Sequence, residues 1–463
     1  MRYETISYSG SGRLILFFTG WGMDAAPFAT LSRPGYDIAV VWDYCSFDID
    51  WSFVSQYDEI CVVAWSFGVY AASVTLLAIA GKVTRCMAVN GTLYPCDRHR
   101  GIPPAIFNGT LAGLSERSVA KFYRRMCGST TAYAHFCRTV PQRDIASLRL
   151  ELEAFAPEAT LLHQSIDIFD IAIISRDDAI IPAVNQWRAW QGTPSVFIDA
   201  YHLVDFQRII DYFIVDKVRV GQRFTAGFAS YDSEADVQAL VVERMLSMME
   251  RNGVCRRLAM TGCRVLEIGS GTGSLSRQLD VLSADAYLEM WDIAGNACVE
   301  GARRRFRRVD AETGIGHVHT ESFDIIASAS TMQWFNSPTR FLRQCHRVLC
   351  KGGYAVLSTF EAGNLAEVAA VTGRSLPLMN FRQWLLAIPD TFELVDCMRL
   401  RRTLVFDSAI DVFRHLKATG VNALGRSASG ESDLHDILRR YSPGLDGKYH
   451  ITYRPIIFIL RKK

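Results

Sequence analysis

Two copies of one local pattern constrain the fold of this chain more than any other feature. In each copy an apolar run turns sharply at a short glycine-containing segment into a helix-like stretch. In the first half, residues 59–64 lead into Trp65-Ser66-Phe67-Gly68, and in the second half, residues 265–268 lead into Gly269-Ser270-Gly271-Thr272-Gly273. Strand–turn–helix units of this kind build parallel sheets with crossover helices. The sequence therefore predicts an α/β protein with two doubly wound domains.

The apolar runs along the chain fall into two groups, which predicts two domains. At roughly 100–200 residues per domain, 463 residues already suggest more than one. We expect a first domain at 1–218 with a helical insertion at about 111–163, and a second at 222–463 with a lid at about 360–441. The strands expected in the first domain are 13–18, 59–64, 85–89, 168–174 and 194–198. Those expected in the second are 264–268, 287–291, 305–309, 323–328 and 354–358, with final strands within 451–460.

Composition and charge exclude several classes of protein. Hydrophobic residues make up 49% and charged residues 21% of the chain, as in soluble globular proteins. No apolar run approaches the roughly 18 residues of a membrane-spanning helix, and the first residues lack the basic and apolar regions of a secretion signal. The 12 cysteines include no CxxC pair, which argues against a zinc site and a disulfide framework. The net charge of +2 is unlike that of nucleic-acid-binding proteins. We expect a cytoplasmic protein without a bound metal.

The turn in the first half has the arrangement of a nucleophile elbow. Ala64-Trp65-Ser66-Phe67-Gly68 follows the G-x-S-x-G pattern with Ala in the first Gly position, where a small residue lets strand and helix pass closely. Such a serine needs an acid and then a histidine downstream. Asp178 follows one predicted strand, with Asp177 as the alternative acid, and His202 follows the next strand. We therefore predict that Ser66, Asp178 and His202 form a catalytic triad.

The predicted triad implies ester hydrolysis. His202 would accept the proton of Ser66 as the hydroxyl attacks an ester carbonyl, while Asp178 holds the imidazole tautomer. The backbone N–H groups of Phe67 and of Trp21, in the loop after the first strand, are the candidate oxyanion donors. The side chain of Trp21 could equally be a core aromatic.

Two segments in this half resemble a known family. Residues 18–24 (FTGWGMD) and 64–68 (AWSFG) are similar to the corresponding motifs of BioG, the pimeloyl-ACP methyl ester esterase family of biotin synthesis. The TGWG loop is also similar to the HGWG loop of related esterases, and its missing histidine fits BioG better than BioH. The resemblance covers about residues 1–215. It implies an α/β-hydrolase fold and a methyl ester of pimeloyl-ACP as the substrate.

The turn in the second half is a glycine loop suited to a cofactor. Residues 265–274 (VLEIGSGTGS) have E-x-G-x-G-x-G spacing, and glycines allow the backbone to approach a cofactor closely. The dinucleotide-binding fingerprint is similar. Two acids at the ends of later predicted strands favour S-adenosylmethionine. Asp292 would bind the ribose hydroxyls, and Asp310 would bind the adenine amino group. The predicted cofactor-binding residues are Glu267, Gly269, Gly271, Gly273, Asp292 and Asp310.

Four further segments resemble the BioC family of malonyl-ACP O-methyltransferases. They are 223–232 (RFTAGFASYD), 332–334 (MQW), 416–420 (LKATG) and 447–453 (GKYHITY), and the resemblance covers essentially residues 222–463. It implies a class I methyltransferase fold that methylates the free carboxylate of malonyl-ACP. A carboxylate is ionised at neutral pH, with a pKa near ~4, so we expect orientation rather than acid–base chemistry. Lys417 is the candidate cation for this carboxylate, with a surface lysine as the alternative.

Together the two halves predict a bifunctional enzyme that performs the first and last steps of one route in biotin synthesis. The two resemblances imply that methylation hides the malonyl charge during elongation and that the esterase removes the methyl group at the pimeloyl stage. The partner would be the acidic acyl carrier protein. Four residues at helical spacing are the docking candidates, unless they form a merely solvated face: Arg117, Lys121, Arg124 and Arg125. We expect no nucleic-acid or membrane partner, and the oligomeric state stays open.

Two other interpretations share these motifs. An α/β-hydrolase could be fused to a small-molecule methyltransferase of another pathway. The first half could also be a non-catalytic docking module for the carrier protein, although the intact Ser66, Asp178 and His202 argue against it.

Overall fold

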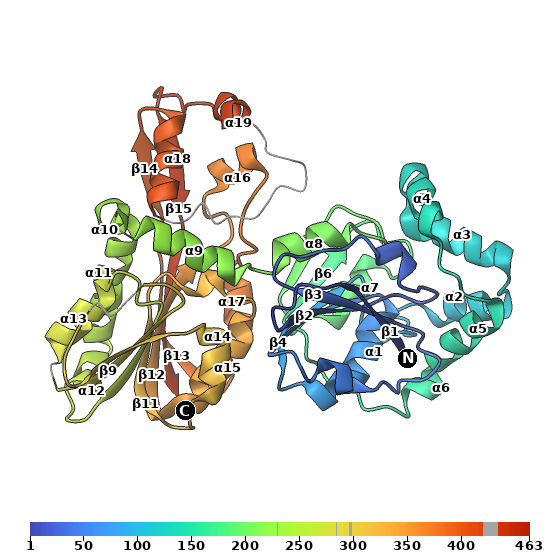
Figure 1. The fold of residues 1–463 in the computed structure, drawn as a ribbon, viewed down its shortest axis with the longest axis horizontal. Coiled ribbons are helices and arrows are strands. Elements are labelled where there is room, and N and C mark those ends of the chain that lie inside the picture. The colour runs from blue at the N-terminus through green and yellow to red at the C-terminus, as the bar shows by residue number, and fades with distance from the viewer. Residues whose placement is uncertain (229, 284, 296–298, 420–433) are drawn as a thin grey trace. The chain divides into compact units, whose positions relative to one another are not determined.

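The chain divides into two compact units, each built around its own sheet (Figure 1). The structure is a computed structural model that describes residues 1–228, 230–283, 285–295, 299–419 and 434–463. The units are Met1–Ile210 and Asp211–Lys463, so the division lies before the predicted boundary at 218–222. Two motif residues, Ala229 and Gly420, and part of the predicted lid lie outside the described residues. Among the described residues, no helix combines the length and apolar character needed to cross a membrane.

The first unit contains a sheet whose neighbouring strands are all parallel except β1 and β3. Their order is β1-β3-β2-β4-β5-β6-β7. The strands are β1 (Arg2–Ser7), β2 (Arg13–Phe18), β3 (Asp37–Trp42), β4 (Glu59–Trp65), β5 (Val83–Val89), β6 (Ile171–Ser175) and β7 (Ser195–Ile198). Strands β2, β3 and β4 are buried along almost their whole length. Strands covered on both faces read as continuous apolar runs, which is why β2 and β4 could be located from the sequence. Strands β1 and β3 were not predicted.

Helices connect these strands and bring the predicted site residues to one edge of the sheet. They are α1 (Phe67–Thr75), α7 (Ala183–Ala189) and α8 (Phe206–Phe213), which leads into the second unit. The carboxyl ends of parallel strands meet at the same edge of a sheet, where open α/β sheets bind ligands. Ser66 follows β4, Asp178 lies after β6 and His202 after β7.

A helical insertion separates β5 from β6. It consists of α2 (Pro104–Ala112), α3 (Glu116–Cys127), α4 (Thr130–Phe136), α5 (Ile145–Ala154) and α6 (Pro157–Thr160). It begins earlier than the predicted start at 111, with Pro104 in the first turn, a position that proline favours. Helix α3 is bounded by a capping box between Ser115 and Ser118 and by Gly128, whose φ of 71° ends the helix.

The second unit contains a sheet in the order β10-β9-β8-β11-β12-β16-β13. Its strands are β8 (Arg264–Ile268), β9 (Tyr287–Asp292), β10 (Arg304–Arg308), β11 (Phe323–Ser328), β12 (Leu349–Phe360), β13 (Phe392–Arg399) and β16 (Pro455–Lys462). Strand β16 is antiparallel to both of its neighbours, and the other pairs are parallel.

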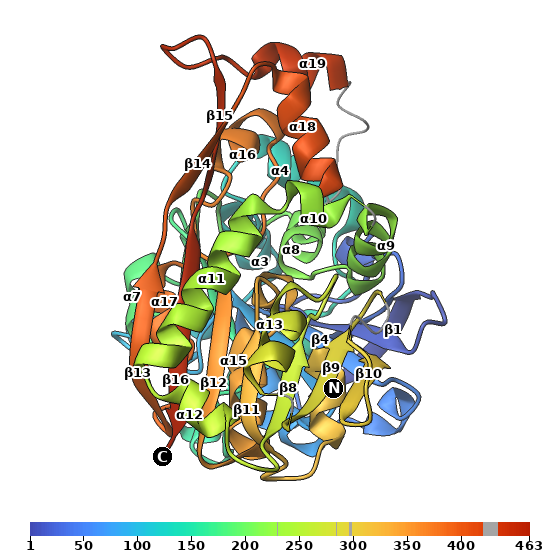
Figure 2. The same ribbon diagram turned by 90° about the vertical axis from the view of Figure 1, so that its left-hand side faces the viewer.

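Helices cover both faces of this sheet and supply two separate apolar clusters. One face packs against α11 (Asp236–Arg251), α12 (Val254–Leu258) and α13 (Ser274–Leu282), which lie in front of the sheet in Figure 2. The other packs against α14 (Ala311–Gly314), α15 (Pro338–Val348) and α17 (Phe381–Ala387). Two further helices, α9 (Lys217–Gly227) and α10 (Tyr231–Glu234), precede α11.

The range predicted as a lid, 360–441, does not form one continuous layer. Strand β13 lies inside this range yet pairs with β16 in the central sheet, and Trp384 of α17 belongs to a core cluster of that sheet. The sequence missed β13 because Glu393 and Asp396 interrupt its apolar pattern. The remaining elements of the range share a third apolar cluster with β15 (Tyr449–Tyr453), which follows the range. They are α16 (Ala366–Thr372), β14 (Arg402–Phe406), α18 (Ala409–Ala418) and α19 (Leu434–Arg440).

Candidate active sites

Ser66 occupies a strained turn between β4 and α1. Its φ and ψ of 56° and −125° are rare for a residue other than glycine, and such conformations concentrate at functional sites. The helix that follows passes very close to β2, because a Cβ atom on Gly68 would collide with the carbonyl oxygens of Phe18 and Thr19. The local geometry therefore requires glycine two residues after Ser66.

Ser66, His202 and Asp178 form a hydrogen-bonded chain of buried side chains. The Nε2 atom of His202 lies 3.0 Å from Oγ of Ser66, and its Nδ1 atom lies 2.9 Å from Oδ2 of Asp178. With Nδ1 facing a carboxylate, the ring donates there and leaves Nε2 to accept the serine proton. The alternative acid, Asp177, is exposed, whereas Asp178 is buried and contacts the imidazole.

Both partners of the serine are fixed by further hydrogen bonds. Asp178 accepts from the backbone N–H groups of Ile180 (2.8 Å) and Ile181 (2.9 Å), and from Nε2 of Gln186 (2.8 Å). The carbonyl oxygen of His202 accepts from the indole Nε1 of Trp65 and from Nδ2 of Asn90, each at 2.9 Å. Sequence reasoning missed Gln186 and Asn90, because neither lies in a recognisable motif.

The two predicted oxyanion donors lie on segments next to Ser66. Phe67 begins α1 directly after the serine. The loop after β2 passes beside it, since a Cβ atom on Gly20 would lie 3.2 Å from the Cβ atom of Ser66. Within the described chain, the backbone N–H groups of Trp21 and Phe67 have no hydrogen-bond acceptor. The Trp21 side chain is buried and its indole donates to the carbonyl of Leu148 (2.9 Å), so it has a packing role.

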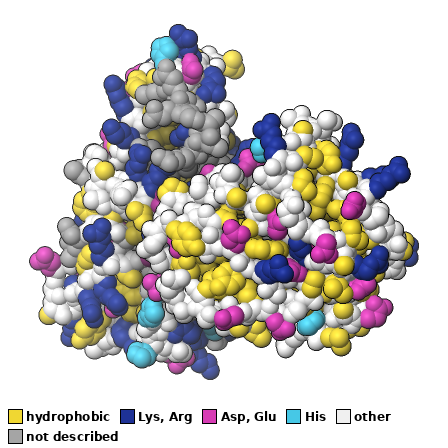
Figure 3. Space-filling view, turned by 45° about the vertical axis from the view of Figure 1, so that its right-hand side comes forward, with side chains coloured by type: hydrophobic (Ala, Val, Ile, Leu, Met, Phe, Trp, Pro, Cys, Tyr) yellow, Lys and Arg dark blue, Asp and Glu magenta, His cyan; other side chains and the backbone are white. Residues whose placement is uncertain are grey.

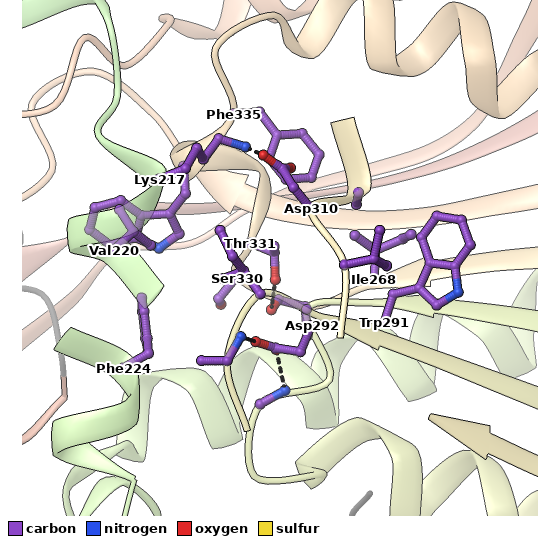
Figure 4. A pocket seen from close by; sticks show the side chains of 18 of the residues that line it. Lys217, Val220, Phe224, Ile268, Trp291, Asp292, Asp310, Ser330, Thr331 and Phe335 are labelled. Atoms are coloured by element: carbon purple, nitrogen blue, oxygen red, sulfur yellow. Dashed lines mark hydrogen bonds and ion pairs between the residues drawn. The ribbon is translucent and has the colours of Figure 1, made fainter. Parts of the chain in front are cut away.

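The second unit has a pocket at the carboxyl ends of β8, β9 and β11 (Figure 4). Four of the residues predicted to bind the cofactor line it: Gly269, Gly271, Asp292 and Asp310. The two glycines differ in what makes a side chain unfavourable. A Cβ atom on Gly269 would collide with Thr331, whereas one on Gly271 would meet nothing within 4 Å and would project into open space. Both have positive φ angles, 71° and 50°.

Asp292 ties the end of β9 to the glycine loop. It accepts from the backbone N–H groups of Gly271 and Ala294, each at 2.7 Å. Burial raises the pKa of this carboxyl, although these bonds oppose the shift. In Figure 4, Asp292 lies beside the loop, while Asp310 and Lys217 lie next to each other in another part of the pocket.

Glu267 and Gly273, also predicted to bind the cofactor, lie outside the pocket lining. Glu267 is fully buried and accepts a 2.6 Å hydrogen bond from Oγ of Ser276 on α13. Burial raises its pKa to about 8. Gly273, with a φ of 89°, is the residue from which α13 begins. The structure therefore gives both residues contacts that support the loop from behind.

Lys217 is a pocket residue that sequence reasoning missed. Its Nζ atom lies 3.0 Å from Oδ1 of Asp310 and 2.7 Å from Oε2 of Glu312, and 4.9 Å from the centre of the Phe335 ring. Burial opposes the charge of this lysine, but the two carboxylates outweigh it and raise its pKa. No local signal marks it, because its partner Asp310 is 93 residues away.

The side chains of the predicted cationic residues are exposed. Lys417 is exposed on α18 and is not part of the pocket lining, so the structure does not bring it to Asp292 or Asp310. Arg117, Lys121, Arg124 and Arg125 are all exposed on α3. Lys and Arg side chains project along the upper right of Figure 3, the side on which α3 and α4 lie. Among the described residues, no group of His, Cys, Asp and Glu is arranged to hold a metal ion.

Two protein families match the chain. One, described as pimeloyl-ACP methyl esterase BioG, matches residues 1–213, and the other, described as methyltransferase domain, matches residues 266–357. A malonyl-(acyl-carrier protein) O-methyltransferase of Bacteroides fragilis is 34% identical over 463 residues, which covers 97% of this chain and 93% of that protein. One of Haemophilus influenzae is 31% identical and covers 53% of this chain and 95% of its own length.

Among solved structures, the BioG crystal structure from Haemophilus influenzae is 33% identical, with a TM-score of 0.41. It covers 45% of this chain and 96% of its own. The sequence matches confirm both resemblances that the motifs predicted.

Proposed function

This chain belongs to the malonyl-(acyl-carrier protein) O-methyltransferase family and carries a BioG domain ahead of the methyltransferase domain, and from this premise we propose that one polypeptide makes and later removes the same kind of methyl ester. The second unit would methylate the free carboxylate of malonyl-ACP. The first would hydrolyse the methyl ester of pimeloyl-ACP. The observation that carries the proposal is that each unit has its own complete candidate site.

In the first unit, we propose an α/β-hydrolase fold with Ser66 as nucleophile. His202 takes the hydroxyl proton as Oγ attacks the ester carbonyl, and the backbone N–H groups of Phe67 and Trp21 stabilise the oxyanion. The same imidazolium then protonates the departing methoxide, which leaves as methanol and gives an acyl-serine. Water, deprotonated by His202, attacks that ester and releases the carboxylate. The 3.0 Å contact between His202 and Ser66 supports this assignment.

In the second unit, we propose that the pocket holds S-adenosylmethionine. The residues fit such a molecule: Gly271 leaves open space toward the pocket, Asp292 and Asp310 place carboxylates on it, and the buried indole N–H of Trp334 lacks an acceptor among the described residues. When bound, this cofactor supplies a methyl group on a sulfonium. The chain then needs to orient an already ionised carboxylate and to exclude water, with no proton to move.

The substrate carrier is proposed to be the acyl carrier protein, docked on α3 of the first unit. The buried face of helix α3 consists of Val119, Tyr123 and Met126, and the basic residues on its opposite face are exposed. Within the described chain, no ion-pair partner lies beside any of the four basic residues predicted for docking, which are Arg117, Lys121, Arg124 and Arg125. A negatively charged carrier would be attracted to such a face.

The decisive experiment supplies the purified full chain with two carrier-linked substrates. Transfer of a labelled methyl group from S-adenosylmethionine to malonyl-ACP tests the second unit. Release of methanol from methyl pimeloyl-ACP tests the first. Activity on small-molecule acids and esters alone, without either carrier-linked substrate, would favour a hydrolase–methyltransferase fusion of another pathway. Methyl transfer without any ester hydrolysis would favour a docking role for the first unit.

A further inference from the structure

The helical insertion of the first unit holds the loop that follows β2 by five hydrogen bonds. Gly22 donates its N–H to Oε2 of Glu151 (3.2 Å) and accepts from the hydroxyl of Tyr123 (2.9 Å). The other bonds, in the order of the loop residues, join Trp21 to Leu148 (2.9 Å), Met23 to Arg143 (3.0 Å) and Asp24 to Gln142 (2.7 Å). Each of four consecutive loop residues is thus attached to the insertion.

Glu151 is the buried centre of this attachment. Its side chain is fully inaccessible to solvent, and its second oxygen, Oε1, accepts from the backbone N–H of Tyr44 after β3 (3.1 Å). Arg143 lies 3.4 Å from Oε2 and also pairs with Asp43 at 3.1 Å. One carboxylate therefore joins α5 to the loops after two neighbouring strands. A buried carboxylate is unfavourable unless it is bonded in this way.

The attached loop carries the candidate oxyanion donor. Trp21 is the residue before Gly22, and Gly20 lies against Ser66. Gly22 has a φ of 75°, and a Cβ atom there would lie 3.2 Å from the side chain of Leu148 on α5. The Trp21 N–H belongs to the peptide between Gly20 and Trp21, which is joined to the Trp21–Gly22 peptide at the Cα atom of Trp21. A shift of the Trp21–Gly22 peptide would therefore move this N–H relative to the serine. Oxyanion donors act only when they are held in place before the reaction begins.

We propose that Glu151 is a positioning residue for ester hydrolysis, which holds the Trp21–Gly22 peptide so that the Trp21 N–H faces the developing oxyanion. The inference rests on the proposed esterase function of this unit. It gives the insertion a role in the chemistry itself, through the inner side of α5, besides any role in carrier docking.

The test uses Glu151→Ala and Glu151→Gln in the full chain with p-nitrophenyl butyrate, an ester that needs no carrier protein. We expect kcat to fall about tenfold to a hundredfold in Glu151→Ala, with KM within about twofold of the parent, because only the transition state loses a contact. Glu151→Gln keeps the shape and one acceptor oxygen, so kcat should fall only a few-fold. Inhibition by a boronic acid, whose serine adduct carries a tetrahedral oxygen, should weaken in parallel with kcat.

Asp43→Asn is the matched control, because it breaks the other ion pair of Arg143 without touching Gly22. It should leave kcat near the parental value. Parental kcat and boronate affinity in both Glu151 variants would overturn the inference, as would an equal loss in Asp43→Asn. If Glu151→Ala does not fold, the comparison of kcat and boronate affinity between Glu151→Gln and Asp43→Asn decides the question. Ser66→Ala distinguishes a failure of the proposed esterase function from a failure of the role of Glu151. Continued hydrolysis in that variant would refute the proposed function itself.

Discussion

The two units differ in where their chemistry resides. The first unit presents a complete chain of side chains, in which Ser66, His202 and Asp178 are hydrogen-bonded and each partner is fixed by further bonds. The pocket of the second unit consists largely of loop backbone, apolar walls and carboxylates, with a buried lysine that is already paired. We interpret the contrast as a difference in the proposed reactions. Ester hydrolysis must move protons, whereas methyl transfer to a carboxylate needs position and a dry site.

The largest expected effect is the loss of the nucleophile. Ser66→Ala should lower the rate of methyl pimeloyl-ACP hydrolysis by at least about 10⁴-fold, because no other group at the elbow can form the acyl intermediate. Methyl transfer by the second unit should be unchanged. Methanol release measures the first activity and labelled methyl transfer the second. Parental methanol release would show that the triad assignment is wrong.

The next effect concerns the glycine loop. Gly271→Val should weaken binding of S-adenosylmethionine by more than about a hundredfold, since the side chain would fill the open space that Gly271 leaves. Calorimetry of cofactor binding is the measurement, and hydrolysis should survive. Gly262→Val is the matched control: Gly262 also has a positive φ, 75°, and open space around it, but it precedes β8 and does not line the pocket. Similar losses in both variants would indicate backbone strain rather than a cofactor contact.

A third prediction concerns selectivity, because the two proposed reactions oppose each other. An esterase that accepted the malonyl methyl ester would undo methylation. The pimeloyl group has four more methylenes, each contributing up to about 0.8 kcal/mol when buried. We expect kcat/KM to favour the pimeloyl ester by roughly a hundredfold, equivalent to about 3 kcal/mol. Kinetics with both carrier-linked esters measures this ratio. Equal efficiencies would mean that chain length does not protect the malonyl ester.

A smaller effect is expected at Lys217. Lys217→Met would leave Asp310 and Glu312 without the cation that lies 2.7–3.0 Å from them. Two carboxylates left without a cation should distort that side of the pocket and weaken S-adenosylmethionine binding about tenfold, with ester hydrolysis unchanged. Lys448→Met is the control, since Lys448 pairs with Asp407 at the exposed surface. An unaltered cofactor affinity in Lys217→Met would limit this lysine to a structural role.

The smallest effect should come from the surface of α3. Reversing the charge of Lys121 and Arg124 should raise KM for methyl pimeloyl-ACP about threefold to fivefold at low salt, with kcat nearly constant. Hydrolysis of p-nitrophenyl butyrate by the same variant should not change. A KM that stays constant for the carrier-linked ester at every salt concentration would indicate that the carrier docks elsewhere.

Much of the fold and of the first site could be predicted because buried parallel strands leave a plain signal. Runs such as β2 and β4 are apolar after their first residue, and the loops that follow parallel strands converge at one edge of the sheet. Ser66, Asp178 and His202 lie in the turns that follow β4, β6 and β7. The choice between Asp177 and Asp178 needed the structure, since only the contact with His202 distinguishes two adjacent acids.

The residues that sequence reasoning missed are those whose partners are distant along the chain. Glu151 lies in a helix whose alternating charges indicate a solvated face, yet it is buried by Gly22 and Tyr44, 129 and 107 residues away. Lys417 is the opposite case. Its motif suggested a site residue, but the buried members of that segment are Leu416 and Thr419, and the lysine faces solvent.

The chain passes from one unit to the other inside a helix. The division between Ile210 and Asp211 falls within α8 (Phe206–Phe213), and residues 214–216 alone separate α8 from α9. Helical backbone offers proteases little extended chain to cut. Each molecule therefore carries one copy of each of the two proposed catalytic centres. Gene expression cannot change this one-to-one ratio. Under the proposed function, the balance between methylation and ester hydrolysis then depends on the intrinsic rates of the two centres.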